Sequence, residues 1–437
     1  MNRFARTLTS IFAVALILCS ASLNRAQTSE TSPYTTAVTE DVVLQWNRVL
    51  GQTLQVPDIH PGNILPVRSF AMMHLAMFDA VNSIDGTYTP YLTDVPGTRF
   101  ASTKVAAAKA AYDVLSALYP SRRAVFDAEF LVSLDGGQPN RNKQAIRVGE
   151  LCAAAILTNR TNDGWNSPWT PYLLAPTPGN WQELFPGPYP GFAVFTNYPG
   201  VRPFALSSST QFLPSPPPAL SSAEYAASLN EVKDLGDVNS TRRTADQAMT
   251  VFLWANPPVS DALMFGVARS TAIARNNSTV ENARLFALVF MAYHDALQTT
   301  FTSQYYYGLW RPVTAIRRAN EDGNAGTVQD ANWESLLGPA GTPPHPSYAS
   351  NASSASSSLA TTLALFYGRD NIQFQIDFGG NGTRNYRTFS ALTNEVARSR
   401  VFGGVHFPFD IVEGQAAGRN VATYTFLNYL KPRDGRF

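Results

Sequence analysis

Cysteine, histidine and charge are all scarce in this 437-residue sequence. Its two cysteines, Cys19 and Cys152, exclude a disulfide-rich scaffold and the cysteine-rich metal clusters, because both need several thiols close together. Five histidines leave little for a metal site built from imidazoles. The 33 basic residues nearly balance the 32 acidic ones and form no basic run, so the charge pattern of a nucleic-acid-binding protein is missing. Any anion site must therefore be local.

Apolar residues are abundant by contrast. Hydrophobic residues make up 45% of the chain and aromatic residues 12%, whereas only 15% are charged. Such a composition can bury a large core and is unlike that of a disordered segment. The length allows one large domain or two to three ordinary ones.

The first 26 residues are typical of a secretory signal peptide. Arg3 and Arg6 precede an apolar run at 11–18, and Ala26 provides a small residue at a cleavage point. The run is shorter than the ~20 residues of a membrane span, so we expect a secreted or periplasmic protein without a stable span; an uncleaved anchor is the alternative. Cleavage would leave Cys152 as the remaining thiol, and its apolar neighbours predict a buried side chain rather than a nucleophile.

Apolar spacing along the rest of the chain predicts an all-α protein, since strand-like alternation is scarce. Expected helices span Thr39 to Leu50, Arg68 to Ile84, Ser102 to Leu118, Arg141 to Leu157, Ser222 to Leu235, Thr244 to Trp254, Asp261 to Arg275, Thr279 to Leu297, Leu359 to Phe366, Arg384 to Val401 and Ile411 to Leu430. Segment 168–218 holds 13 of the 30 prolines and predicts a long irregular excursion. We expect an N-terminal helical half at 27–220, which includes this excursion, and a C-terminal bundle at 221–437.

Three C-terminal segments carry residues suited to anion chemistry. In the first, the permanently charged Arg311 precedes a proline that fits the first turn of a helix. The second is a proline-rich stretch that leads into a helix near Ser350, where free N–H groups can bind an oxyanion, and six serines among residues 350–358 predict caps and close packing. The third supplies Arg400 and then His406, whose spacing to Asp410 lets the carboxylate hold one imidazole nitrogen.

These segments resemble the shared motifs of the vanadium-dependent haloperoxidases and the type 2 phosphatidic acid phosphatases. Those motifs read Lys-x6-Arg-Pro, Pro-Ser-Gly-His and Ser-Arg-x5-His-x3-Asp. The matching residues are Arg311 and Pro312, then Ser350, then Ser399, Arg400, His406 and Asp410. Segments at 72–81, 201–204 and 216–220 look like the secreted haloperoxidase branch, so the resemblance covers nearly all of the mature chain.

The resemblance implies two four-helix bundles, with the oxyanion pocket in the C-terminal one. It implies that His406 is the covalent ligand of vanadate, and hence the metal ligand, or the nucleophile toward phosphate. Arg311, Arg400 and Ser350 would then bind the oxygens of the anion, and Asp410 would orient His406. A small molecule such as peroxide, halide or a phosphoester would be the substrate, and no nucleic acid would bind.

Two positions depart from the family pattern. Gln304 stands where the family has its lysine, and Asn351 and Ala352 replace the Gly-His of the second motif. The uncharged Gln304 and Asn351 can still hydrogen-bond an oxyanion, but Ala352 provides no acid or base. His345 lies five residues before Ser350 and could supply the proton instead, or it could merely pack between two prolines.

Three functions therefore remain open. The first is a vanadium-dependent haloperoxidase, the second is a phosphohydrolase with a histidine nucleophile, and the third is an altered pocket used for oxyanion binding or for vanadium-independent chemistry. The other histidines offer no competing site: His74 and His294 are expected in the core or at caps, and His60 in an exposed loop.

Overall fold

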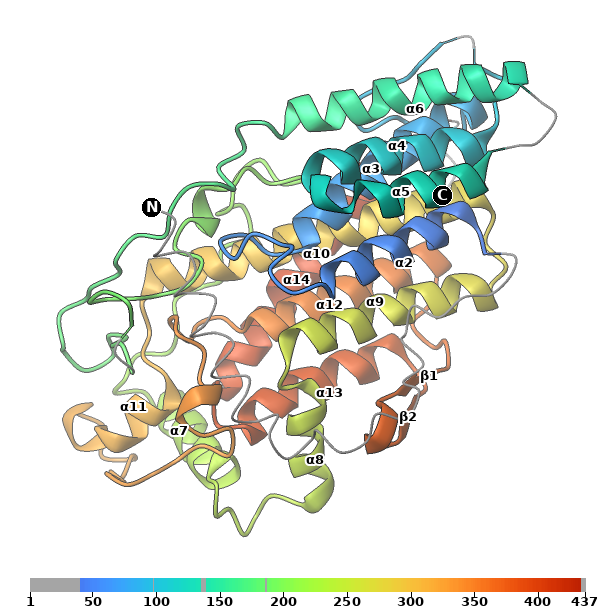
Figure 1. Cartoon of the computed structure of the whole chain (residues 1–437). Helices are drawn as coiled ribbons and strands as arrows, with labels where there is room; N and C mark the ends of the chain where they lie inside the picture. Colours follow the sequence, from blue (N-terminus) through green and yellow to red (C-terminus); the bar gives the residue numbers. More distant parts are fainter. Residues whose placement is uncertain (1–39, 97, 135–138, 185–186, 434–437) are drawn as a thin grey trace.

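The computed structural model describes residues 40–96, 98–134, 139–184 and 187–433 (Figure 1). The expected signal peptide lies outside these residues. Helices dominate, as predicted, and the sheet is a single two-stranded hairpin within the described part. The helices are α2 (Val42–Leu54), α3 (Val67–Asp85), α4 (Thr103–Leu118), α5 (Arg123–Ser133), α6 (Pro139–Asn159), α7 (Ala223–Gly236), α8 (Ala245–Trp254), α9 (Pro257–Ala274), α10 (Thr279–Tyr307), α11 (Pro312–Arg317), α12 (Asn351–Tyr367), α13 (Phe389–Phe402) and α14 (Pro408–Asn428).

The ends of the long helix α10 show how local sequence sets helix bounds. The Ser278 hydroxyl accepts a hydrogen bond from the backbone N–H of Glu281, and the Glu281 carboxylate accepts one from the backbone N–H of Ser278. These two bonds form a capping box. At the other end, Gly308 has a φ of 62°, a left-handed conformation that glycine adopts without strain. The helix continues ten residues past the predicted Leu297. Its last turns carry buried threonines whose hydroxyls donate to carbonyls of the same helix, which satisfies polar groups that the apolar spacing did not include.

The expected helix from Arg384 to Val401 begins too early, and this prediction is wrong at its start. Arg384 lies in strand β2 (Thr383–Tyr386), which pairs antiparallel with β1 (Phe374–Asp377). Helix α13 starts only after Thr388, whose side chain caps it. Helix α5 was not predicted, and its apolar side chains divide between core and solvent: Phe126 is buried, whereas Leu131 and Val132 are exposed.

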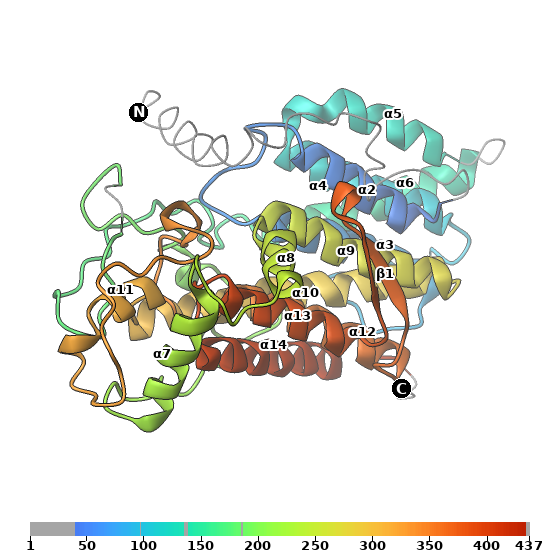
Figure 2. The same ribbon diagram turned by 90° about the horizontal axis from the view of Figure 1, so that it is seen from below.

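Two sets of helices pack around α10. Helices α3, α4 and α6 pack on one another and form the first set, and α12, α13 and α14 form the second. Helix α10 contacts α3 of the first set and α12 and α14 of the second. Figure 1 shows α10 between the blue to green helices and the red ones, and Figure 2 shows α12, α13 and α14 side by side. One buried apolar core extends through both sets. The predicted division into an N-terminal half and a C-terminal bundle, between residues 220 and 221, stays a prediction.

The serine-rich start of α12 packs closely against α14, as predicted. A Cβ at Gly414 would come within 2.5 Å of the Ser350 carbonyl oxygen, and one at Gly418 would collide with the Ser354 carbonyl. Small side chains on both helices therefore permit an approach that larger ones would prevent. This contact fixes the start of α12 beside the first turns of α14.

The proline-rich excursion is irregular, as expected, apart from a short 3-10 turn at Tyr198–Gly200. It packs on the end of the molecule where α10 ends and α11 begins (Figures 1 and 2). The Trp181 N–H donates to the Gly308 carbonyl at 2.7 Å, and the Val194 N–H donates to the Pro344 carbonyl at 3.1 Å. The excursion thus covers the loop that leads into α12. None of the described helices is both long and apolar enough to span a membrane.

Candidate functional site

The three C-terminal segments meet in one buried place. Arg311, which precedes α11, lies 3.2 Å from His406 through its Nη1 and 3.1 Å from His345 through its Nη2. His406 in turn contacts Asp410 in the first turn of α14. The Ser350 N–H donates to the Asp410 carbonyl at 3.0 Å, which ties the start of α12 to the same turn.

The hydrogen bonds of His406 define its tautomer. Its Nδ1 lies 2.9 Å from Asp410 Oδ2, so Nδ1 carries the proton and donates to the carboxylate. Its Nε2 lies 3.2 Å from Arg311 Nη1, a group that can only donate, so Nε2 keeps its lone pair. Burial, followed by the charges of Arg311 and Arg400, holds the pKa of His406 well below its ordinary value. His406 is therefore neutral, with an unprotonated nitrogen toward a guanidinium.

Asp410 is held by more donors than its motif predicts. Its Oδ2 accepts from His406, from the Phe407 N–H at 3.1 Å and from the Ser347 hydroxyl, while Oδ1 has no partner among the described residues. Burial raises the pKa of Asp410 to about 7, and the Ser347 hydroxyl opposes this rise. The sequence did not single out Ser347, because a serine 63 positions away from its carboxylate partner gives no local signal.

Arg311 is fully buried and forms no ion pair with any described carboxylate. Its Nε donates to the His345 carbonyl at 2.8 Å and its Nη1 to the Val405 carbonyl at 2.9 Å. Burial lowers its pKa to about 9. The guanidinium is thus fixed in position by carbonyl oxygens, and the charge of Asp410 reaches it only from beyond ion-pair distance.

Arg400 is even less satisfied. Its side chain makes one hydrogen bond to the described residues, from Nη1 to the Trp254 carbonyl at 3.4 Å, and its Nε is buried without a partner among them. Burial lowers its pKa to about 10. Other buried arginines are compensated in different ways: Arg68 and Arg160 share Asp163, whereas Arg284 lies over three aromatic rings. Two buried cations without counter-charges indicate a place for an anion, because the desolvation of each costs several kcal/mol if unpaired.

The first turn of α12 adds polar groups to the site. Ser350 caps the helix: its hydroxyl accepts from the Ser353 N–H at 3.4 Å and from the Ser353 hydroxyl at 3.0 Å. Gln304 on α10 reaches this turn and donates to Asn351 Oδ1 at 3.0 Å. Hydrogen bonds thus join most of the residues that the sequence placed in the pocket, and Arg400 acts on His406 through its charge. Ala352, at the position of the family histidine, packs its methyl group on the apolar core.

Residues 284–435, which include all of these side chains, match the family model described as the VCPO second helical-bundle domain. The likeness to this family model thus covers roughly the last third of the chain.

Solved structures of bacterial vanadium-dependent haloperoxidases share the fold. A structure titled as the first bacterial vanadium-dependent iodoperoxidase matches with a TM-score of 0.72 at 23% identity, over 90% of this chain and 96% of that one. A holo-type bacterial vanadium-dependent chloroperoxidase matches with a TM-score of 0.68 at 18% identity, over 89% and 97% of the two chains. An apo-type one matches with a TM-score of 0.66 at 17% identity, over 85% and 94%. No curated protein sequence matches at a significant level.

The position of His345 bears on its predicted role. Its ring packs against Phe301, and its Nδ1 lies 3.1 Å from Arg311 Nη2 and 3.2 Å from the Pro346 carbonyl oxygen. Its Nε2 lies 3.5 Å from the same Arg311 Nη2. Burial and the neighbouring Arg311 hold its pKa well below the ordinary value, so His345 is neutral. Contact with Arg311 places it in the site, and a proton-transfer role stays a prediction.

The remaining histidines lie outside the site. His74 is buried among phenylalanine rings with its Nε2 3.0 Å from the Asn47 amide, and His294 lies 2.9 Å from Asp295, as expected for core residues. The expected exposure of His60 is wrong: it is half-buried, because the Tyr119 hydroxyl and the Ile64 carbonyl both bond its ring. Cys152 is buried, and burial raises its pKa to about 12, which confirms an unreactive thiol.

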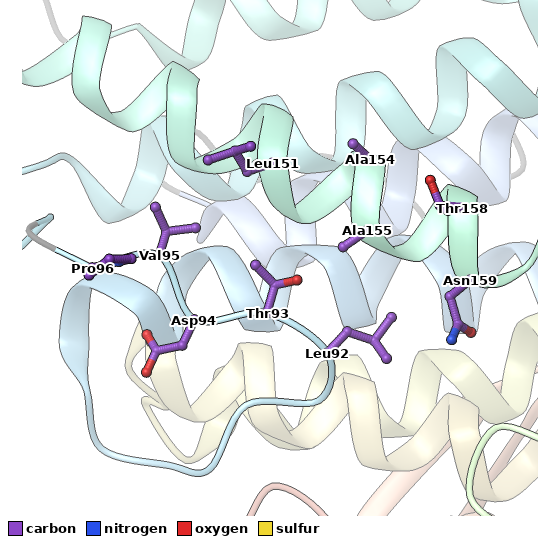
Figure 3. Close-up of a pocket in the computed structure, with 10 residues that line it drawn as sticks. All are labelled: Leu92, Thr93, Asp94, Val95, Pro96, Leu151, Ala154, Ala155, Thr158 and Asn159. Carbon is purple, nitrogen blue, oxygen red and sulfur yellow. The ribbon is translucent and has the colours of Figure 1, made fainter.

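A cavity of about 630 Å³ lies beside α6, in the first set of helices (Figure 3). It runs between the segment at 92–96 and α6, and alanine and leucine side chains such as Leu92, Leu151 and Ala155 line much of it. Its ionisable lining residue, Asp94, is paired with Arg433 at 2.5 Å. Because no histidine or arginine lines it, this cavity provides none of the groups found around His406.

Ser347→Ala is expected to move the pH dependence of vanadate binding to higher pH. The hydroxyl stabilises the ionised form of Asp410, so its removal raises a pKa that is already about 7. Asp410 ionises as pH rises, and the ionised form holds the Nδ1–H of His406 and leaves Nε2 free to bind. The midpoint of the rise in affinity should therefore shift upward by roughly one pH unit.

Vanadate titrations over a pH series measure this shift. Ser399→Ala is the matched control, because this buried serine donates only to the Val396 carbonyl of its own helix, at 2.6 Å. Coincident pH curves for wild type and Ser347→Ala would show that Asp410 does not control binding.

Proposed function

We propose that this chain is a vanadium-dependent haloperoxidase that oxidises halide with peroxide. The observation that supports the proposal is the pairing of two buried, uncompensated arginines with a neutral histidine. Arg311 and Arg400 provide fixed positive charge, and His406 turns an unprotonated nitrogen toward Arg311. The site therefore offers an oxyanion both compensation of its charge and one nitrogen ligand.

The donor set fits vanadate. Arg400 Nε is a buried donor without a partner, and Arg311 has no carboxylate. Arg311, Arg400 and the first turn of α12 would hold the oxygens of the anion, and His406 Nε2 would be its covalent ligand. When bound, vanadate supplies the Lewis acidity that activates peroxide toward attack by halide.

The residues of the chain divide the remaining tasks. The ionised form of Asp410 keeps the proton of His406 on Nδ1, and the Ser347 hydroxyl favours that ionised form. Arg311 and Arg400 stabilise negative charge in a site from which water is largely excluded, where fixed donors act more strongly than in bulk water. His345 packs against Phe301 beside Arg311, and we propose that it exchanges protons with the bound substrate.

The proposal is tested by adding vanadate to the protein freed of bound anions. We expect a dissociation constant in the micromolar range or below, about −8 kcal/mol or stronger. Bromide or iodide with peroxide should then halogenate a phenolic dye, and only after vanadate has been added. A protein that binds no vanadate and halogenates nothing is not a vanadium-dependent haloperoxidase.

The same His406 geometry favours a phosphohydrolase as the second candidate. An unprotonated Nε2 can attack the phosphorus of a phosphoester, and a neighbouring guanidinium can hold the oxygens of that phosphate. Hydrolysis of a generic phosphomonoester, inhibited by vanadate and lost in His406→Ala, would support this candidate. Oxyanion binding without either activity would instead support the altered pocket that Gln304 and Ala352 suggest.

A further inference from the structure

Gln304 presents a buried hydrogen-bond acceptor at the start of α12. Its side chain is fully buried, and its Nε2 donates to the Ala349 carbonyl at 2.7 Å and to Asn351 Oδ1 at 3.0 Å. A backbone carbonyl can only accept, so the Ala349 carbonyl fixes which end of the amide is nitrogen. Both N–H groups are then used, and Oε1 is left buried with no partner among the described residues.

The Gln304 amide lies beside Ser350, a residue of the proposed anion site. The two partners of its Nε2, the Ala349 carbonyl and Asn351 Oδ1, flank Ser350, which caps α12. Arg400, also in the proposed site, has a buried Nε donor with no partner within the described chain. The site therefore combines unsatisfied donors with an unsatisfied acceptor, and Asp410 Oδ1 is a second such acceptor.

We propose that Gln304 makes this site selective for oxyanions that carry a proton, with phosphate and vanadate preferred over sulfate. At neutral pH phosphate and vanadate keep at least one O–H, which can donate to Gln304 Oε1 while the other oxygens accept from the arginines. Sulfate has no proton to donate, so its oxygen would meet the amide oxygen as one acceptor against another. A buried acceptor left unsatisfied reduces affinity, here by roughly tenfold or more.

The inference rests on the proposed oxyanion site, and calorimetric titrations separate the two. Inorganic phosphate, vanadate and sulfate are added in turn to the full chain at constant ionic strength near neutral pH. We expect phosphate and vanadate to bind at least about tenfold more tightly than sulfate. If none of the three binds, the proposed function fails. If all three bind and sulfate equals phosphate, the site stands and the selectivity is overturned.

Two variants assign the selectivity to Gln304. Gln304→Lys replaces the acceptor with a donor, so sulfate should gain more than phosphate and the ratio of their dissociation constants should approach one. Gln304→Met keeps the length of the side chain without an acceptor, and phosphate should weaken toward sulfate. Gln375→Lys adds the same charge on the exposed face of β1 and should leave the ratio unchanged.

The inference can still be tested if one of the two Gln304 variants fails to fold. Thermal unfolding identifies such a variant, and the other one then reports alone. A wild-type preference for phosphate that persists in a folded Gln304 variant would show that another group reads the proton, and the assignment to Gln304 would be overturned.

Discussion

His406→Ala should lose vanadate-dependent halide oxidation altogether, while phosphate binding to the site is only weakened. The imidazole Nε2 of His406 keeps a lone pair and lies 3.2 Å from Arg311 Nη1. Vanadate depends on that nitrogen for a covalent bond, so its affinity should fall by more than the roughly 10- to 100-fold typical of changes to outer-shell partners. Phosphate relies on Arg311 and Arg400, which the substitution leaves in place.

Three measurements on His406→Ala separate these contributions: vanadate titration, phosphate titration and the dye-halogenation rate. His60→Gln is the control, since His60 is bonded to Tyr119 and Ile64 and has no contact with the site. Retained halogenation in folded His406→Ala would mean that the activity, whatever its origin, does not use this pocket.

Rebuilding the second family motif is expected to raise the peroxidase rate. The variant combines Gln304→Lys, Asn351→Gly and Ala352→His. Ala352 is half-buried in the first turn of α12, one residue from the amide that Gln304 bonds. An imidazole there would stand at the start of the helix that holds Ser350. General acid-base help of this kind changes rates by about 10²- to 10⁴-fold, and a lysine near the anion should strengthen vanadate binding as well.

The rate with saturating vanadate measures the first effect, and the vanadate dissociation constant measures the second. Ala364→His places the same side chain on the same helix far from its capped end and should change neither. If the triple variant folds and both quantities stay at wild-type values, the alignment of Gln304 and Ala352 with the family lysine and histidine is wrong.

The sequence predicted the contact between His406 and Asp410 because its geometry is local. A histidine and an aspartate four positions apart, at the start of a helix, meet almost whatever surrounds them, and His406 and Asp410 do so at 2.9 Å. The proline after Arg311 and the serine run after Ser350 likewise mark helix starts that the structure confirms.

Other features depend on contacts between distant parts of the chain. Ser347 joins the site only because the loop before α12 folds against α14, and His60 is shielded because Tyr119 reaches it from another segment. The hairpin strands β1 and β2 have four residues each, too few for alternation to stand out from the helical pattern that follows. In each case the deciding partner lies outside the window in which a pattern can be read.

The uncompensated charges of Arg311 and Arg400 also make folding depend on the solution around the protein. Two cations enclosed without counter-ions weaken the empty native state, whereas an anion that binds only that state returns free energy to it. By mass action, an oxyanion at 100 times its dissociation constant adds about 2.7 kcal/mol to the stability of the fold. On the proposed function the bound oxyanion therefore stabilises the fold as well, and we expect the resistance of the chain to heat and proteolysis to rise with the oxyanion concentration.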